Sequence, residues 1–306
     1  MGSARARTLS AATLARWPLP DAGTDADKEA RGHVLVVAGS HEMPGAALLA
    51  ATAALRAGAG KLTIAAPERV AQGLALAIPE ARVVGLVETR AGGFRAGGAQ
   101  QLAALADKIS AVVMGPGMLD EARSSDFVAA MLPLFAHSVV VLDALAMSVV
   151  RQGAFAQPVI LTPHAGEMAY LSGLTKEAIC EQPLAAAREA AFAWNACVVL
   201  KGGQTLIAEP DGAAWRYDDG GTPGLATSGS GDTLAGLIGG LAARGLPPVR
   251  AAGWGVLLHG RAGEVLARRQ GPLGYLAREI AAEVPALIHA IGKRARNKTA
   301  AAQSPR

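Results

Sequence analysis

A short run of small residues at 227–236 has the composition of an anion-binding loop that leads into a helix. It reads TSGSGDTLAG, in which Gly229, Ser230 and Gly231 precede an apolar segment. Free backbone N–H groups at such a junction, together with the helix dipole, favour a bound phosphate. Asp232 is either the helix N-cap or a general base beside the anion, placed to deprotonate a hydroxyl that attacks a phosphoryl group. The run is not a Walker A loop, because it lacks the Gly-Lys-Ser/Thr triplet.

Two further segments place polar side chains directly after apolar runs. In LTPHAGE, at 161–167, we favour a ligand-binding role for His164 over a purely structural one. Glu167 is a magnesium ligand acting through water, a charge in the first turn of a helix, or simply solvated. In KGGQT, at 201–205, Lys201 either faces phosphates or is the solvated lysine of a hairpin turn.

Two glycine-rich turns complete the set of candidate segments. GPG at 115–117 follows the apolar run AVVM and makes a rigid turn that exposes backbone N–H groups. Small residues at 38–47, where Ala46 and Ala47 begin a predicted helix, allow a flat ligand to lie against backbone. Close packing of that helix would demand the same residue types, so both interpretations stay open.

Short apolar runs and longer Ala/Leu-rich segments alternate along most of the chain, and these elements must position the candidate residues. Runs such as VVVL and CVVL are apolar at every position, as strands covered on both faces are. The alternation predicts an α/β fold with a mainly parallel sheet between helices, and ligands at the carboxyl ends of its strands. Predicted strands lie at 33–38, 61–65, 82–87, 111–114, 138–142, 159–161 and 197–200. Predicted helices lie near 44–57, 97–108, 120–132 and 183–194, with a further one starting near Pro67.

The pattern changes after residue 200. Turns rich in glycine separate the segments 205–208 and 213–217, which predicts a small antiparallel meander. Helices over 233–243, 249–268 and about 275–291 then close the domain. We expect a short helix or disorder over 1–27, a single domain over 28–292, and a disordered basic tail over 293–306.

Composition narrows the class of protein. The chain has 306 residues, of which 51% are hydrophobic and 18% charged, with a net charge of +4. These values argue against wholesale disorder and against a nucleic-acid-binding protein. No run approaches the roughly 20 apolar residues of a membrane span. The two cysteines show neither metal nor disulfide spacing, so we expect a cytoplasmic enzyme.

Taken in order, these segments resemble the ADP-dependent NAD(P)H-hydrate dehydratases of the ribokinase-like superfamily. The likeness runs from about residue 28 to 291. It implies a ribokinase-like three-layer α/β/α sandwich, commonly a homotetramer, that repairs NADH or NADPH hydrated at C6 of the nicotinamide ring. The segments that carry it are AGSHEMPGAALLA, LRAGAGKLTIA, VVMGPG, ILTPHAGE, VVLKGGQTLIAEPDG and ATSGSGDTLAGLIGGL.

The resemblance also implies roles for individual residues. Asp232 would take the proton of the C6 hydroxyl as that oxygen attacks the β-phosphate of ADP, with Mg²⁺ offsetting the diphosphate charge. Gly229, Ser230 and Gly231 would form the anion hole for the transferred phosphoryl group. The hydrated nicotinamide would contact Ala46, Ala47, Gly117, His164 and Asp232. The adenine nucleotide would contact Lys201, Gly202, Gly203, Gln204, Thr205 and Gly231.

Two other functions compete with this one. A ribokinase-like small-molecule kinase would use the same loop and base to phosphorylate a vitamin-type alcohol such as hydroxyethylthiazole, pyridoxal or hydroxymethylpyrimidine. A nucleotide-binding protein without turnover would lack the acidic residue that Asp232 supplies. The choices between ADP and ATP, and between NADH and NADPH hydrate, stay open, as does the role of Asp143. Because only about 30 residues precede the first strand, we expect no fused epimerase domain and a separate NAD(P)H-hydrate epimerase or spontaneous exchange.

Overall fold

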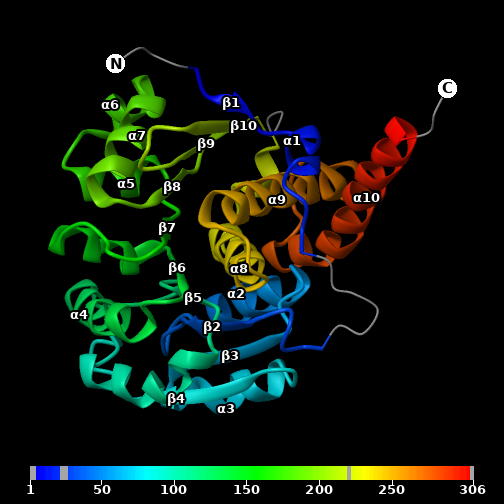
Figure 1. Ribbon diagram of the computed structural model, residues 1–306. Helices are drawn as coiled ribbons and strands as arrows, with labels where there is room; N and C mark the ends of the chain where they lie inside the picture. Colours follow the sequence, from blue (N-terminus) through cyan, green and yellow to red (C-terminus); the bar gives the residue numbers. More distant parts are fainter. Residues whose placement is uncertain (1–4, 21–26, 219–221, 304–306) are drawn as a thin grey trace.

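In a computed structural model, which describes residues 5–20, 27–218 and 222–303, ten strands form one sheet (Figure 1). Their order is β1-β10-β9-β8-β7-β6-β5-β2-β3-β4. All neighbouring pairs are parallel except those of β9, which runs antiparallel to β8 and β10. The strands are β1 (Arg7–Thr8), β2 (His33–Val37), β3 (Lys61–Pro67), β4 (Arg82–Leu86), β5 (Ala111–Met114), β6 (Val139–Leu142), β7 (Val159–Leu161), β8 (Cys197–Leu200), β9 (Gln204–Ala208) and β10 (Ala214–Asp218).

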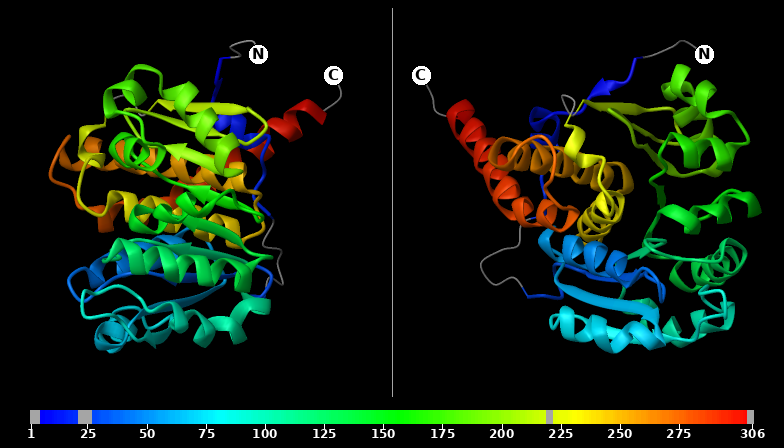
Figure 2. Two further views of the ribbon diagram at one scale, coloured as in Figure 1. Left: turned by 90° about the vertical axis from the view of Figure 1, so that its left-hand side faces the viewer. Right: turned by 180° about the vertical axis from the view of Figure 1, so that it is seen from behind.

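Helices cover both faces of this sheet (Figures 1 and 2). One face carries α1 (Ala11–Ala15), α2 (Pro44–Arg56), α3 (Glu68–Ala77), α8 (Ser230–Ala243), α9 (Pro248–Gln270) and α10 (Ala277–Gln303). The other carries α4 (Glu121–Met131), α5 (Ala165–Ser172), α6 (Lys176–Glu181) and α7 (Pro183–Trp194), with the 3₁₀ segments η1 (Ala96–Lys108), η2 (Leu132–Phe135) and η3 (Ala144–Gln152). A last 3₁₀ turn, η4, spans Pro223–Leu225. The predicted three-layer sandwich and the antiparallel meander are confirmed.

The central strands are buried because each face of the sheet has its own apolar core. In β2, Val34 and Val36 contribute to the core on the α8 side, whereas Leu35 and Val37 contribute to the opposite core. All four side chains are fully buried. Successive side chains of the strand thus point to opposite faces of the sheet, and both faces are apolar. The uninterrupted apolar runs predict this arrangement for strands covered on both sides.

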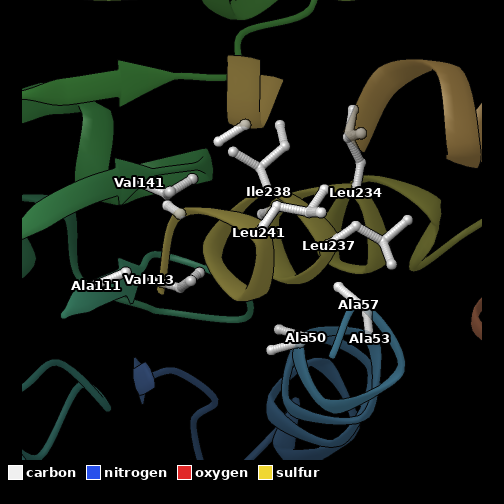
Figure 3. Close-up of a cluster of buried hydrophobic side chains, with 14 of the residues drawn as sticks. Ala50, Ala53, Ala57, Ala111, Val113, Val141, Leu234, Leu237, Ile238 and Leu241 are labelled. Carbon is white, nitrogen blue, oxygen red and sulfur yellow. The ribbon is translucent and has the colours of Figure 1, made fainter. Parts of the chain in front are cut away.

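Helix α8 packs unusually closely against α2. This contact fixes the position of α8, which begins with Ser230, Gly231 and Asp232. A Cβ atom on Gly236 would stand 2.1 Å from the carbonyl oxygen of Ala50, and one on Gly240 would stand 2.3 Å from that of Ala54. Only glycine therefore allows the two backbones to approach so closely. Figure 3 shows the surrounding cluster, in which Leu234, Leu237, Ile238 and Leu241 of α8 meet Ala50, Ala53 and Ala57, with Val113 and Val141 of the sheet beside them.

We expect Gly236→Ala to lower the free energy of unfolding by about 2–3 kcal/mol, because the added methyl group must push α8 away from α2. Gly73 is the matched control: it also lies inside a helix, α3, but an added Cβ would meet no atom within 4 Å. Gly73→Ala should raise stability by about 0.5–1 kcal/mol through helix propensity alone. Chemical denaturation of both variants checks the pair, and equal effects would contradict the close contact.

The expected short helix near the start of the chain is present as α1, whereas the other end of the chain differs from the expectation. Strand β1 pairs with β10, and the indole N–H of Trp254 donates to the carbonyl oxygen of Trp17, so the segment before residue 20 is tied to the domain. Helix α10 continues to Gln303, where a disordered tail is predicted from residue 293. Alanine, lysine, arginine and glutamine dominate 293–303, and their high helix propensity accounts for the extension. Residues 1–4, 21–26 and 304–306 lie outside the described part.

Helix α8 also starts earlier than predicted. Gly229 is its N-cap, in a left-handed conformation with φ of 85°, so the helix begins at Ser230 rather than Thr233. The alternative that Asp232 is the N-cap is therefore wrong, because Asp232 lies inside the first turn.

Within the described residues, no helix combines the length and the apolar character that crossing a bilayer requires.

Candidate active site

Five neighbouring strands end at one place, and four of them end in segments that the sequence singles out. Strands β8, β7, β6, β5 and β2 are adjacent and parallel, so their carboxyl ends meet at one edge of the sheet. Beyond these ends the chain places, in the same order, Lys201, the segment 162–164, Asp143, the turn 115–117 and Gly39. The topology thus assembles side chains from segments far apart in sequence.

Lys201 is the centre of a buried charge cluster at this edge. Its Nζ atom lies 3.1 Å from Oδ1 of Asp143 and 3.7 Å from Oε2 of Glu167. Burial alone would lower the pKa of Lys201, but the charges of Asp143 and Glu167 outweigh it and the pKa is raised above its ordinary value. Lys201 is therefore a fixed positive charge rather than the solvated turn lysine of the structural interpretation.

Asp143, to which the sequence assigned no role, is one of the most buried polar residues of the protein, with 3% of its surface exposed. Besides the ion pair with Lys201, its Oδ1 atom accepts a 2.6 Å hydrogen bond from the hydroxyl of Thr162. The next residue, Ala144, has a φ of 48°, a left-handed conformation that costs an alanine about 1–2 kcal/mol. Local strain of this kind is concentrated at functional sites, where the surroundings hold it in place.

Asp232 stands in the first turn of α8, partly exposed, at the same cluster. Burial and then the negative charge of Asp143 raise the pKa of Asp232 to about 6, while Lys201 opposes the shift. The preceding backbone at Gly231 is close enough that an added Cβ would stand 3.4 Å from Nζ of Lys201. A carboxyl group with a pKa near neutrality, next to a fixed cation, suits a general base.

His164 caps helix α5. Its Nδ1 atom accepts hydrogen bonds from the backbone N–H groups of Gly166 and Glu167, at 3.0 and 3.1 Å, and Glu167 Oε2 accepts from the N–H of His164 at 2.8 Å. Because Nδ1 is an acceptor, Nε2 carries the ring proton of the neutral imidazole. The side chain of His164 is 59% exposed, so it combines a capping role with an accessible donor.

A cavity of about 670 Å³ opens beside this cluster. Part of the cavity wall is polar. Another part is apolar, and its residues come from β10, η4, α8 and α9. The polar or glycine residues lining it include His164, Lys201, Gly202, Gly203, Thr205, Ser230 and Gly231. The apolar wall includes Tyr217, Leu225, Leu234 and Val256. A cavity lined by apolar side chains, a cation and a helix N-terminus suits a purine nucleotide and its phosphates.

The remaining predicted residues lie outside this lining. The side chain of Gln204, at the start of β9, donates to Asp218 at 3.3 Å instead. Gly117, with φ of 67°, abuts the start of α2: a Cβ there would stand 2.7 Å from the Cβ of Ala46. Ala47 is fully buried in α2. The structure therefore brings Gly117 and Ala46 together, as two residues of one substrate site would be.

The backbone N–H groups of Ser230 and Gly231 in the anion loop differ in whether they already have a hydrogen-bond partner. The N–H of Ser230 donates to the carbonyl oxygen of Thr227 at 3.2 Å, so it is already satisfied. The N–H of Gly231 has no backbone partner outside its helix among the described residues and lies in the first turn, where helical partners are missing. Gly231 thus offers its amide to an anion, whereas Ser230 offers its hydroxyl.

Among the cavity residues that were not predicted from the sequence is a histidine. His259 of α9 lines the cavity, and its Nε2 atom lies 3.0 Å from Oγ and 3.1 Å from the carbonyl oxygen of Ser230. A lone histidine in a helical segment has no motif around it, so only the packing of α9 on α8 reveals its position.

The fold and this site define the class of the ribokinase-like enzymes. A ribokinase-like superfamily protein of Enterococcus faecalis aligns with a TM-score of 0.81 and 26% identity, covering 94% of this chain and 96% of that chain. The chain belongs to the NAD(P)H-hydrate dehydratase family, whose model matches residues 34–286.

Two relatives in this family resemble the chain over nearly its whole length. The ADP-dependent (S)-NAD(P)H-hydrate dehydratase of Xanthomonas campestris is 48% identical over 288 residues, which cover 94% of this chain and 98% of that protein. The ADP/ATP-dependent NAD(P)H-hydrate dehydratase of Bacillus subtilis, co-crystallised with ATP and Mg²⁺, aligns with a TM-score of 0.80 and 31% identity. That alignment covers 95% of this chain and 99% of the Bacillus chain.

Proposed function

We propose that this chain is an ADP-dependent dehydratase that acts on the (S)-epimer of hydrated NADH or NADPH. It regenerates the reduced dinucleotide and releases AMP and phosphate. The observation that carries the proposal is the placement of Asp232, a carboxyl group with a pKa of about 6, beside Lys201 and the free amide of Gly231. The family membership and the two relatives support the same reaction.

The reaction divides into a phosphoryl transfer and an elimination. Asp232 accepts the proton of the C6 hydroxyl while that oxygen attacks the β-phosphorus of ADP, and the bond to AMP breaks. The electron pair of the ring nitrogen then expels phosphate from C6. A proton then passes from C5 to the released phosphate or to water, which restores the double bond of the dihydronicotinamide. No electrons leave the substrate, so the step needs no oxidant.

Lys201 and the start of α8 would stabilise the transferred group. The Nζ atom of Lys201 lies close to Gly231, whose amide is free among the described residues, since a Cβ added to Gly231 would be 3.4 Å from Nζ. Both are donors to a phosphate oxygen, and neither must reorganise greatly when charge develops. The apolar wall of the cavity would hold the adenine.

The charges of the cluster explain why Mg²⁺ would accompany the nucleotide. In the described part of the chain, Asp143, Glu167 and Asp232 face one cation, Lys201, so a diphosphate meets a negative surplus unless a divalent ion offsets it. Among the described residues no group of three His, Cys, Asp or Glu side chains could hold a metal by itself. Glu167 already accepts from the N–H of His164. These residues fit an ion that is bound mainly through nucleotide phosphates and water, with Glu167 as an outer contact.

The reaction itself is the test. Purified protein is mixed with NADH hydrate, ADP and Mg²⁺, and the absorbance band of reduced nicotinamide is followed while AMP and phosphate are quantified. We expect the band to appear in proportion to the AMP formed, and to stop near half conversion if the hydrate is a mixture of epimers. An unchanged band, with a stable phosphoester formed from a vitamin-type alcohol, would establish the kinase instead.

His164 offers a way to separate substrate contact from helix capping. We expect His164→Ala to weaken hydrate binding about tenfold and ADP binding much less, and to lower stability by about 1 kcal/mol through the lost cap. His164→Ser keeps an oxygen that can cap α5, so it should lose hydrate affinity with little loss of stability. Steady-state KM values and thermal denaturation check both variants. Equal effects on hydrate and ADP would contradict a contact to the nicotinamide end.

Further features follow from the same proposal. We infer that Ala46, Gly117 and His164 contact the hydrated nicotinamide, whereas Ala47 is fully buried and makes no such contact. We also infer that the enzyme works in the cytoplasm as a homotetramer beside a separate epimerase. Support comes from the contact between Gly117 and Ala46 and from exposed leucines such as Leu76 and Leu273 on the surface. Light scattering of the purified protein would test the tetramer. Competing ADP against ATP in the same assay would settle the phosphoryl donor.

A further inference from the structure

His259 approaches the anion loop from a different helix and contacts one residue of it twice. Its Nε2 atom lies 3.0 Å from Oγ of Ser230 and 3.1 Å from the carbonyl oxygen of the same residue. His259 comes from α9, whereas Ser230 is the first residue of α8. Both residues line the nucleotide cavity.

These contacts fix the tautomer of His259. A carbonyl oxygen can only accept a hydrogen bond, so Nε2 must carry the ring proton and share it between the two oxygens of Ser230. Burial lowers the pKa of His259 to about 4, and the charge of Lys201 lowers it as well, against the opposing hydrogen bond to Ser230. The ring is therefore neutral at physiological pH and donates only one proton here.

The tautomer in turn fixes the direction of the serine hydroxyl. Because Oγ of Ser230 receives the proton of His259, its own hydrogen must point elsewhere. Oγ makes no other side-chain or backbone hydrogen bond within the described part of the chain. The backbone N–H of Ser230 is occupied by Thr227. The hydroxyl is thus the donor that Ser230 has left, at a cavity wall beside Gly231.

We propose that His259 is a positioning residue that turns the hydroxyl of Ser230 toward the phosphates of the bound nucleotide. Phosphate oxygens are acceptors only, so a serine that presented its lone pairs would repel them, whereas one that presents its proton binds them. The inference rests on the proposed nucleotide site, but it concerns binding and does not depend on which acceptor receives the phosphoryl group.

The test compares ADP with adenosine, which has no phosphate, by calorimetry on the purified full-length protein. His259→Met removes the donor but keeps an apolar side chain of similar length, and should weaken ADP binding about tenfold while leaving adenosine within about twofold. Ser230→Ala should cause the same selective loss. Ser230→Thr keeps the hydroxyl, and His259→Gln keeps an N–H near the Nε2 position, so both should retain most of the affinity for ADP.

A double variant shows whether the two residues act as one unit. If His259 acts through the hydroxyl of Ser230, adding His259→Met to Ser230→Ala should cost no further ADP affinity. Independent, multiplied losses would overturn the inference, as would equal losses for adenosine and ADP. Wild-type ADP affinity in Ser230→Ala would overturn it even if His259→Met failed to fold. A wild-type protein that binds ADP but leaves NADH hydrate unchanged would contradict the dehydratase function and leave this inference intact.

Discussion

Replacing Asp232 by asparagine should lower kcat by about 100-fold or more and change the affinity for ADP by less than about threefold. The asparagine keeps the shape of the side chain and can still donate or accept hydrogen bonds, but it cannot take the proton of the attacking hydroxyl. Single-turnover measurement of AMP release, beside calorimetric titration with ADP, separates the two effects. An unchanged rate in this variant would remove the proposed base.

The same variant should be more stable than the wild type above pH 6. The pKa of Asp232 is raised from 3.8 to about 6 in the folded protein, chiefly by burial. Its favourable contribution to folding is therefore complete below about pH 4 and is lost as the pH rises through about 6, where an ionised carboxylate must stay buried. Asp232→Asn escapes this cost, so its Tm should exceed that of the wild type by a few degrees at pH 8 and by much less at pH 4.

The activity of the wild type should change with pH in the direction opposite to its stability. The base acts only when ionised, so kcat/KM of the wild type should fall as the pH drops through about 6, the pKa of Asp232. Asp143 contributes to that raised pKa through its charge. Asp143→Asn should therefore move the acid limb of the profile to lower pH. A limb that stays in place in this variant would contradict the electrostatic link between the two carboxyl groups.

Most of the sheet could be predicted from the sequence, because a strand that is buried on both faces can be recognised from its own residues. A run such as 139–142, apolar at every position, has few alternatives to a strand covered on both faces. The start of α8 was misplaced by three residues because the left-handed cap at Gly229 was not recognised as the helix boundary. Extension of α10 to Gln303 was missed because a basic charge run suggests a solvated tail, although the same residues favour a helix.

The site was predictable where a polar residue directly follows a predicted strand. Lys201 and His164 meet that condition, the loop at 229–232 is recognisable from its own glycine-rich composition, and the structure places all three around one cluster. Asp143 meets it too, directly after β6, and the rule of strand ends could have found it. His259 could not be found in this way, because its contact with Ser230 exists only through the packing of two helices. Leu225 and Val256 read as ordinary core residues for the same reason.

The second large effect is expected at Lys201, where folding and ligand binding depend on the same charge. Lys201→Met leaves the carboxylate of Asp143 buried, with the hydroxyl of Thr162 as its one remaining side-chain donor among the described residues. Removing one partner of a buried ion pair costs about 3–5 kcal/mol, so the variant should be markedly less stable. It should also bind ADP at least about tenfold more weakly, since a charge-assisted contact to phosphate is lost.

A double variant separates the two roles of Lys201. Asp143→Asn combined with Lys201→Met removes both charges of the pair, so most of the lost stability should return, as measured by denaturation. The ADP affinity should stay low, because nothing replaces the cation. Recovery of ADP affinity together with stability would mean that Lys201 only neutralises Asp143 and never contacts the nucleotide. Failure of the double variant to regain stability would show instead that the buried charge of Asp143 is not what makes the loss of Lys201 costly.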